Sequence, residues 1–151
     1  MDKGFLLQNF HISNLKKDDR YLVSCGHDGM TYVWRIADGA RVYEFNSRGP
    51  SMSNVAILDD NRTVLGVGSD KTIKKMIDNY VESIDTHNIF SQVALTHSNK
   101  LLFCGAAEEN NGSGYIRCYK LPVLSTFVSE HQVNTFYMCI YLVVRLMMIK
   151  E

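Results

Sequence analysis

Residues 18–45 read DDRYLVSCGHDGMTYVWRIADGARVYEF and decide the fold. The segment contains three β-rich apolar runs, at residues 21–25, 30–36 and 41–45. The motif GHDG at residues 26–29 separates the first two runs, and ADG at residues 37–39 separates the second from the third. Asp-Gly between such runs favours tight hairpin turns. The segment therefore predicts three consecutive antiparallel strands.

The same pattern returns twice further along the chain. Asp70 follows Asp28 by 42 residues, and Met76 follows Trp34 by the same interval. Tyr119 then follows Met76 by 43 residues. A repeat of this length indicates successive copies of one structural unit, each of which buries its faces against its neighbours.

This arrangement resembles a WD repeat, whose blade-sized period is about 40 to 45 residues. Asp28 lies six residues before Trp34, and Ser24 lies four residues before Asp28, which is the spacing of the family; Trp34-Arg35 stands where the family has Trp-Asp. The resemblance implies a structural relay of buried polar side chains. Its expected members here are Ser24, Asp28, Trp34, Asp70 and His131. Trp34 is expected to be largely buried between neighbouring blades and to donate to Ser24.

The sequence predicts an all-β chain, a partial WD-repeat β-propeller of about three and a half four-stranded antiparallel blades. The propeller part is expected at residues 1–140, with blades at about 5–46, 47–86 and 87–129 and the start of a fourth from 130. Residues 141–151 form an atypical apolar tail. Because a closed ring needs four to eight blades, we expect a fragment, a truncated or spliced product, or an oligomer.

The two open ends of a partial propeller are expected to promote association with other chains. Unpaired strand edges and uncovered sheet faces invite pairing with other chains. We therefore expect the isolated polypeptide to associate with the remaining blades of a propeller or with another copy of itself, or to aggregate.

Composition favours protein partners over nucleic acid or membrane. Lys plus Arg and Asp plus Glu each number 16, so no overall field attracts polyanions. Lys71, Lys74 and Lys75 form the densest basic cluster; on a strand Lys71 and Lys75 share a face while Lys74 points away. The cluster is interpreted as a solvated strand face, with a phosphate-contacting patch as the alternative. The apolar run at residues 136–149 is shorter than the roughly 20 residues that span a bilayer, and it contains Arg145. Four scattered cysteines and the absence of a signal-like N-terminus favour a cytoplasmic protein.

Three patterns that resemble enzyme or cofactor sites are better explained structurally. Ser24, His27 and Asp28 supply the side chains of a hydrolytic triad, but Ser24 falls within a strand expected to be buried. Residues 66–70, GVGSD, lack the third glycine and the following helix of a dinucleotide loop. The five histidines do not have metal-site spacing. The sequence therefore predicts a protein that is not an enzyme and has no cofactor or metal.

Residues 106–114, AAEENNGSG, form the longest expected hairpin loop. Glu108, Glu109, Asn110 and Asn111 are candidates for contact with a partner, because recognition often resides in loops on a rigid scaffold. A solvated loop without a partner is the alternative interpretation.

Within the WD-repeat proteins, the stretches YLVSCGHDG, TYVWRIADG and GYIRCYKLP are similar to those of cilia- and flagella-associated members, over about residues 15–140. That resemblance implies an interaction scaffold in the cilium or flagellum axoneme, with axonemal or dynein-associated partners and a role in assembly or motility. The alternative is a generic WD-repeat adaptor in a non-ciliary complex, such as one for ubiquitin ligation or RNA processing.

Overall fold

A computed structural model describes residues 11–15, 20–47, 49–107 and 113–134, and these form twelve β-strands in three antiparallel sheets of four. Sheet 1 contains β1 (His11–Leu15), β2 (Tyr21–Cys25), β3 (Met30–Arg35) and β4 (Arg41–Asn46). Sheet 2 contains β5 (Met52–Ile57), β6 (Val64–Gly68), β7 (Thr72–Ile77) and β8 (Tyr80–Asp85). Sheet 3 contains β9 (Gln92–Leu95), β10 (Leu101–Ala107), β11 (Ser113–Lys120) and β12 (Phe127–Asn134). The prediction of an all-β fold is confirmed for these residues.

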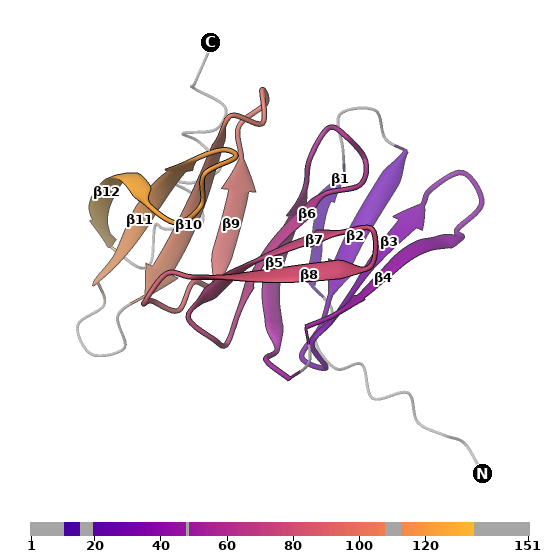
Figure 1. Ribbon diagram of the computed structural model, residues 1–151, viewed down its shortest axis with the longest axis horizontal. Helices are drawn as coiled ribbons and strands as arrows, with labels where there is room; N and C mark the ends of the chain where they lie inside the picture. The colour runs from indigo at the N-terminus through magenta and orange to yellow at the C-terminus, as the bar shows by residue number, and fades with distance from the viewer. Residues whose placement is uncertain (1–10, 16–19, 48, 108–112, 135–151) are drawn as a thin grey trace.

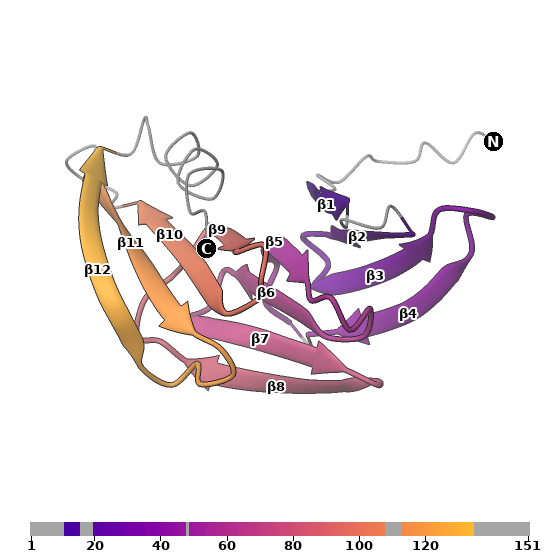
Figure 2. The same cartoon turned by 90° about the horizontal axis from the view of Figure 1, so that it is seen from above.

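Each sheet is built from strands in chain order, so every neighbour within a sheet is also the next strand along the chain. The three sheets stack in sequence, with sheet 2 between the other two (Figure 1). Seen from above, β5 lies between β1 and β9, while β4, β8 and β12 lie towards the outside (Figure 2). The sheets therefore spread apart from their first strands to their last.

The turns between strands follow the local sequence. In the turn after β2, Gly29 has φ 75° and its backbone N–H donates to the Gly26 carbonyl at 3.1 Å. Asp78 and Asn79, which join β7 to β8, have φ values of 48° and 67°. Two consecutive residues with positive φ make the turn whose twist matches a hairpin, and Asn and Asp tolerate that conformation better than most residues.

Each sheet has a forward face, which points towards the next sheet in the chain, and a back face, which points towards the preceding one. The forward face of sheet 1 carries Val23, Cys25, Val33 and Phe45, all at most 2% exposed. These side chains pack against a second set on the back face of sheet 2: Met52, Val55, Ile57, Val64 and Met76. This contact is the first of two hydrophobic cores.

The second core lies between sheets 2 and 3. Leu65, Val67 and Ile73 come from the forward face of sheet 2, and Leu102 and Tyr119 come from the back face of sheet 3. Alternation of side chains along each strand lets sheet 2 contribute to both cores. Each sheet thus depends on its neighbours to bury its faces.

Polar contacts also join the sheets. The Met52 N–H donates to the Gly26 carbonyl at 3.0 Å, linking sheet 2 to the first turn of sheet 1. The Asn54 side-chain amide donates to Gln92 Oε1 at 2.9 Å, linking β5 to the start of β9. These contacts lie near the strands that are closest together in the stack, and they fix the register between sheets.

The third sheet extends further than the sequence pattern predicts. The repeat was expected to end at residue 129, with a fourth copy beginning at Glu130 and His131, but β12 continues to Asn134 and belongs to sheet 3. Its partner β11 is eight residues long and pairs with β12 from Ser113 to Tyr119, so both strands extend together. The remainder of the expected fourth blade and the tail at 141–151 lie outside the described residues.

Candidate interaction surfaces and the predicted relay

The Ser24 and Trp34 side chains form a hydrogen bond within sheet 1. Leu22 is paired with Trp34 and Ser24 with Tyr32, so all four side chains share the back face of the sheet. Trp34 Nε1 donates to Ser24 Oγ at 2.8 Å, and Ser24 is only 6% exposed. The bond satisfies a hydroxyl that would otherwise be buried without a partner.

Trp34 itself is half-buried, and its expected hydrogen bond to Ser24 is confirmed. Its expected place between two blades stays a prediction, because no sheet among the described residues lies opposite it. Its repeat equivalents are Met76 and Tyr119, which face the preceding sheet and are 0% and 2% exposed. Sheet 1 is the first sheet among the described residues. Within the described ranges, no sheet covers the back face of sheet 1 as sheets 1 and 2 cover the equivalent faces of sheets 2 and 3.

Asp28 closes the turn between β2 and β3. Its Oδ1 accepts the Met30 backbone N–H at 3.0 Å, and the residue is exposed, as is His27 beside it. Gly26 lies next to this carboxylate, and a Cβ there would lie 2.8 Å from Asp28 Oδ1, so the Asp28 side chain would have to shift to admit one. Asp28 thus closes the turn and the buried Ser24 hydroxyl accepts the indole N–H of Trp34, while His27 is exposed to solvent.

Asp70, the equivalent of Asp28, has a different set of partners. Asp70 Oδ2 lies 2.7 Å from Lys74 Nζ, and Asp70 Oδ1 accepts the Thr72 hydroxyl at 2.9 Å. Lys74 also donates to Ser83 Oγ at 2.9 Å and is 4% exposed. Of the basic cluster, Lys71 is thus exposed and Lys75 half-buried, whereas Lys74, on the other face of β7, is buried. The pairing of Lys74 with Asp70 makes that burial tolerable.

Arg117 occupies the same place in sheet 3 that Lys74 occupies in sheet 2. Its Nε lies 2.6 Å from Glu130 Oε2, and its Nη1 donates to the Thr86 carbonyl at 3.1 Å. The guanidinium also lies 4.5 Å from the centre of the Phe127 ring and 5.1 Å from that of Tyr115. Arg117 thus ties together β11, β12 and the segment that follows β8.

Sequence reasoning missed both of these cations, although a signal for them was present. Tyr32, Lys74 and Arg117 stand at equivalent positions, two residues before Trp34, Met76 and Tyr119. The back-face position is therefore occupied by a large polar side chain in every repeat. Comparison of the repeats at that offset would have identified it.

The remaining relay and loop residues lie elsewhere. His131 is exposed on β12, where it is paired with Ile116. The five expected relay members are thus distributed over three sheets, and the structure brings together Ser24 and Trp34 as a bonded pair. The candidate loop residues Glu108, Glu109, Asn110 and Asn111 lie outside the described residues.

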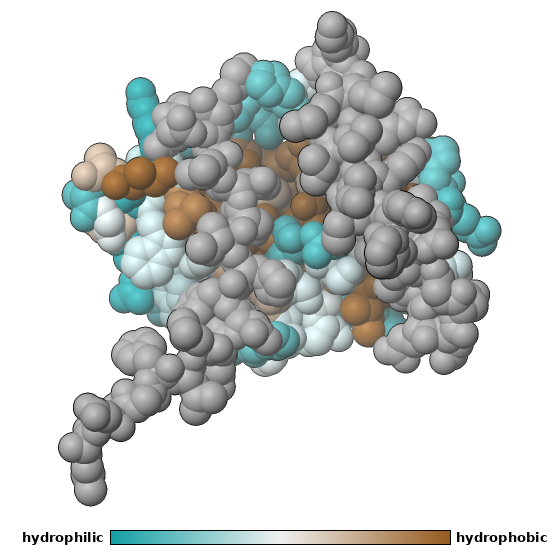
Figure 3. Space-filling view, turned by 180° about the vertical axis from the view of Figure 1, so that it is seen from behind, coloured by the Kyte–Doolittle hydropathy of each residue, from teal (hydrophilic) through white to brown (hydrophobic). Residues whose placement is uncertain are grey.

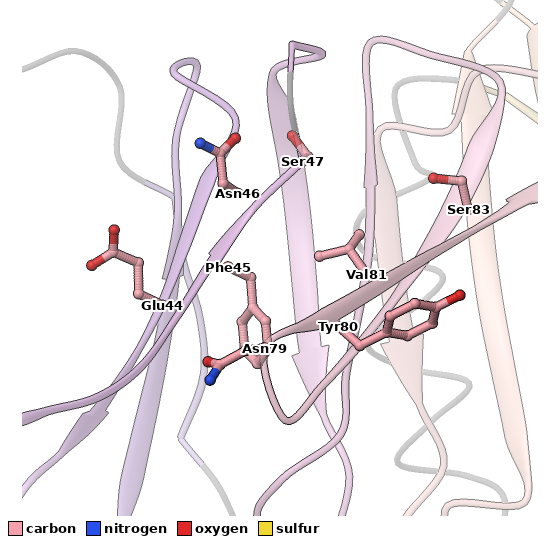
Figure 4. A pocket seen from close by; sticks show the side chains of 8 residues that line it. All are labelled: Glu44, Phe45, Asn46, Ser47, Asn79, Tyr80, Val81 and Ser83. Carbon is pink, nitrogen blue, oxygen red and sulfur yellow. The ribbon is translucent and has the colours of Figure 1, made fainter.

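Two grooves open between the sheets. The larger, of about 570 Å³, lies between β4 and β8 and has Phe45, Asn79, Tyr80 and Val81 among its lining residues. Phe45 points towards the space between the strands and Glu44 away from it (Figure 4). A second groove of about 370 Å³ is lined by residues that include Arg117, Tyr119 and Phe127. Figure 3 shows the opposite side of the molecule, where visible hydrophobic and hydrophilic residues are interspersed.

The buried thiols are poor candidates for reactive groups. Burial, with a smaller effect of the Asp28 carboxylate, raises the pKa of Cys25 to about 12. Burial also raises the pKa values of Cys104 and Cys118 above their usual range. A thiol is reactive as its thiolate, so these groups are inert near neutral pH.

The part of the chain that the structure describes contains no group of three or more His, Cys, Asp or Glu side chains placed to hold a metal ion. The same residues include no helix that is long and apolar enough to cross a membrane.

Comparison with solved structures finds a similar fold. A chain of Kuenenia stuttgartiensis hydrazine synthase superposes with a TM-score of 0.65 over 80% of this chain and 36% of that one. The two sequences are 16% identical, so the likeness concerns the fold alone.

Comparison with curated proteins gives a more specific result. No protein-family model matches the chain. It is 29% identical over 131 residues to cilia- and flagella-associated protein 57 C of Tetrahymena thermophila, covering 78% of this chain and 10% of that protein. It is 31% identical over 120 residues to cilia- and flagella-associated protein 57 of Mus musculus, covering 78% and 9%. The chain thus spans about a tenth of each relative, and this similarity links it to cilia- and flagella-associated proteins.

Proposed function

We propose that this chain is part of a WD-repeat β-propeller that serves as a non-enzymatic protein-interaction scaffold in the cilium or flagellum. The similarity to two proteins named for their association with cilia and flagella carries the proposal. The three stacked sheets support it, because each is a four-stranded antiparallel unit of the size expected for a blade. The partners would be axonemal proteins, including those associated with dynein.

The surfaces of the molecule fit binding better than catalysis. Asp28 closes a turn, Asp70 holds a buried ammonium, and the Cys25 and Cys104 thiols are buried. Their side chains therefore have structural roles that a reaction would disturb. The grooves between the outer strands offer shallow recognition surfaces of the kind that a partner protein can contact.

The test is binding of the tagged 151-residue chain to isolated, demembranated axonemes. We expect the chain to sediment with axonemes and to be released by high salt, and a tagged copy to concentrate in cilia of ciliated cells. Gly68→Ala, which introduces a clash with the Ser51 carbonyl, serves as a folding-deficient control. A folded chain that neither sediments with axonemes nor enters cilia would contradict the ciliary assignment and favour an adaptor elsewhere in the cell.

A further inference from the structure

We propose that the outer edge of sheet 2 binds an extended, basic segment of a partner protein, which pairs with β8 as a fifth strand. The proposal deepens the proposed scaffold function, and rests on it only in assigning this edge to a partner protein. Sheet 2 lies between sheets 1 and 3, and its two faces contribute to the two hydrophobic cores. β8 is therefore the outer edge of sheet 2 whatever further sheets the stack contains (Figure 2).

The first argument is that β8 lacks the usual protection of an edge strand. Among the described residues, the outer strands β4, β8 and β12 each pair with one neighbour. The pairing of β4 with β3 and that of β12 with β11 each contain a register shift, whereas β8 pairs with β7 without interruption from Tyr80 to Asp85. Its sequence, YVESID, contains no Pro, Gly or Lys. Because bulges, Pro and Lys are what keep an edge strand from pairing, β8 is the outer strand best suited to accept another.

The second argument is the space beside β8. Tyr80 is 64% exposed, and the groove of about 570 Å³ lies on the side of β4, with Phe45 and Val81 among its lining residues (Figure 4). An added strand directs alternate side chains to the two faces of the sheet. One row of its side chains therefore enters the groove beside Val81, and the other lies next to Tyr80. In this mode of recognition the main-chain hydrogen bonds supply affinity and the two rows of side chains supply specificity.

The charges of β8 identify the occupant as basic. Residues 78–85, DNYVESID, contain three carboxylates and no Lys or Arg. The Glu82 carboxylate is 4.0 Å from Lys75 Nζ, at the limit of an ion pair, and Asp85 is paired with His87, which is charged only when protonated. The Glu82 and Asp85 side chains are 50% and 66% exposed. Since opposite charges across a strand pair stabilise it, Lys or Arg opposite Glu82 and Asp85 favours binding.

The same charges make a second copy of β8 a poor occupant. No register of two β8 strands places a cation opposite Glu82 or Asp85, because the strand contains none. The antiparallel register centred on Glu82 places two like carboxylates directly opposite each other, which is unfavourable. The edge is therefore complementary to a different chain rather than to itself.

The positions along β8 define the partner segment. In antiparallel pairing, which all three sheets use, six residues of the segment lie in order opposite Asp85 to Tyr80. Basic residues at its first and fourth positions meet Asp85 and Glu82. Apolar residues at its second, fifth and sixth positions meet Ile84, Val81 and Tyr80, and a small polar residue fits the third. The peptide Lys-Val-Thr-Lys-Val-Tyr, acetylated and amidated at its ends, satisfies this pattern.

The experiment titrates this peptide, labelled with fluorescein, with the 151-residue chain and follows fluorescence anisotropy. We expect saturable binding of one peptide per chain, and binding weaker by about tenfold or more when both lysines of the peptide are replaced by glutamate. Hydrogen exchange followed by NMR should show slower exchange of β8 amides when the peptide is bound. Absence of saturable binding to the folded chain, or protection of other strands alone, would overturn the proposal.

Two N-methylated peptides separate strand pairing from simple charge attraction. Methylation of alternate backbone nitrogens blocks one edge of an extended peptide and leaves the other edge intact. One edge faces β8 and the other faces solvent. We therefore expect methylation at the second, fourth and sixth positions and methylation at the third and fifth to differ in effect, one abolishing binding and the other preserving it. Equal effects of the two peptides would contradict pairing with β8.

Charge reversal in the protein tests the register. Glu82→Lys should weaken peptide binding by about tenfold, and glutamate at the fourth position of the peptide should restore it. Glu44→Lys is the matched control, because it makes the same change on β4, where the side chain points away from the groove (Figure 4), and should leave binding unchanged. Failure of the restoring peptide would overturn the proposed register, and a dimer whose β8 amides are protected without peptide would show that a second copy is the occupant. A chain that sediments with axonemes but binds none of the peptides would contradict this inference alone.

Discussion

The buried ion pair of Lys74 and Asp70 shows how one residue connects two sheets. Lys74 lies on the same face of β7 as the buried Met76, and its side chain is 5% exposed compared with 30% for Asp70. An ammonium without a partner in such a place is far less stable than a partly hydrated carboxylate. Removing the Asp70 charge therefore leaves a buried ammonium without a counter-ion, whereas removing Lys74 leaves a partly hydrated carboxylate.

That difference can be measured in the free energy of unfolding. Asp70→Asn leaves a buried charge without its counter-ion and should lower stability by about 3 kcal/mol. Lys74→Met leaves Asp70 with water and the Thr72 hydroxyl and replaces the buried stem by an apolar one, so it should lower stability by about 1 kcal/mol. Urea denaturation of both variants and of the double variant tests this. Equal losses for the two single variants would show that the charge of Lys74 is not the deciding factor.

The Ser24–Trp34 hydrogen bond leads to a second prediction at this scale. Trp34→Phe retains an aromatic ring but leaves the buried Ser24 hydroxyl without its donor, so we expect a loss of about 1 to 2 kcal/mol. Ser24→Ala combined with Trp34→Phe removes both polar groups and should recover part of that loss. Thermal unfolding followed by circular dichroism measures the original protein, both single variants and the double variant, and full additivity of the two losses would argue against the bond.

At the scale of the strand, the closest approach of two backbones occurs where β6 ends. A Cβ on Gly68 would lie 2.0 Å from the Ser51 carbonyl oxygen, which also accepts the Ser69 N–H at 2.9 Å. The pairing of Met52 with Gly68 at the edge of sheet 2 thus depends on the absence of a side chain.

We therefore expect Gly68→Ala to destabilise the protein by more than about 3 kcal/mol, through separation of β5 from β6. Gly39→Ala is the matched control: Gly39 has φ 68°, and a Cβ there meets no atom within 4 Å, so the loss should be about 1 to 2 kcal/mol from backbone strain alone. Hydrogen exchange would show whether the β5 and β6 amides lose protection in the Gly68 variant. Protection of those amides in the Gly68 variant at the level of the original protein would contradict this account.

Local sequence predicts the strands well where a turn marks their ends. The Asp-Gly motifs delimit β2 and β3 to within one residue, because a residue with positive φ is a local requirement of the turn. The end of β12 could not be predicted in the same way, because the length of an edge strand depends on its partner β11. Burial of Lys74 and the incomplete burial of Trp34 could not be predicted for a related reason: both depend on whether another sheet lies opposite.

At the scale of the whole molecule, the two cores hold thiols that have no access to water. Cys25 and Cys104 are both 0% exposed, and Cys25 Sγ donates weakly to the Met52 carbonyl at 3.7 Å across the first core. Their protonation is therefore linked to folding of the whole stack.

Alkaline titration should reveal that linkage. The folded pKa of Cys25 is about 12, compared with an ordinary value of 9.0. The unfolded chain loses this proton at lower pH than the folded chain, so stability should be constant below about pH 9 and fall as the pH rises towards 12. Cys25→Ala should reduce the slope of this fall. Alkylation at pH 8, read by mass spectrometry, should modify Cys25 and Cys104 only after unfolding; rapid modification of the native protein would contradict their burial.

The order of the strands bears on how the chain is made in the cell. Every strand in a sheet is bonded to the next one synthesised, so sheet 1 can form its hairpins before sheet 2 has left the ribosome. Contacts between residues close in sequence form with a small loss of chain entropy and promote rapid folding. A chain of this design can fold in the direction of translation, each completed sheet providing the surface on which the next one docks.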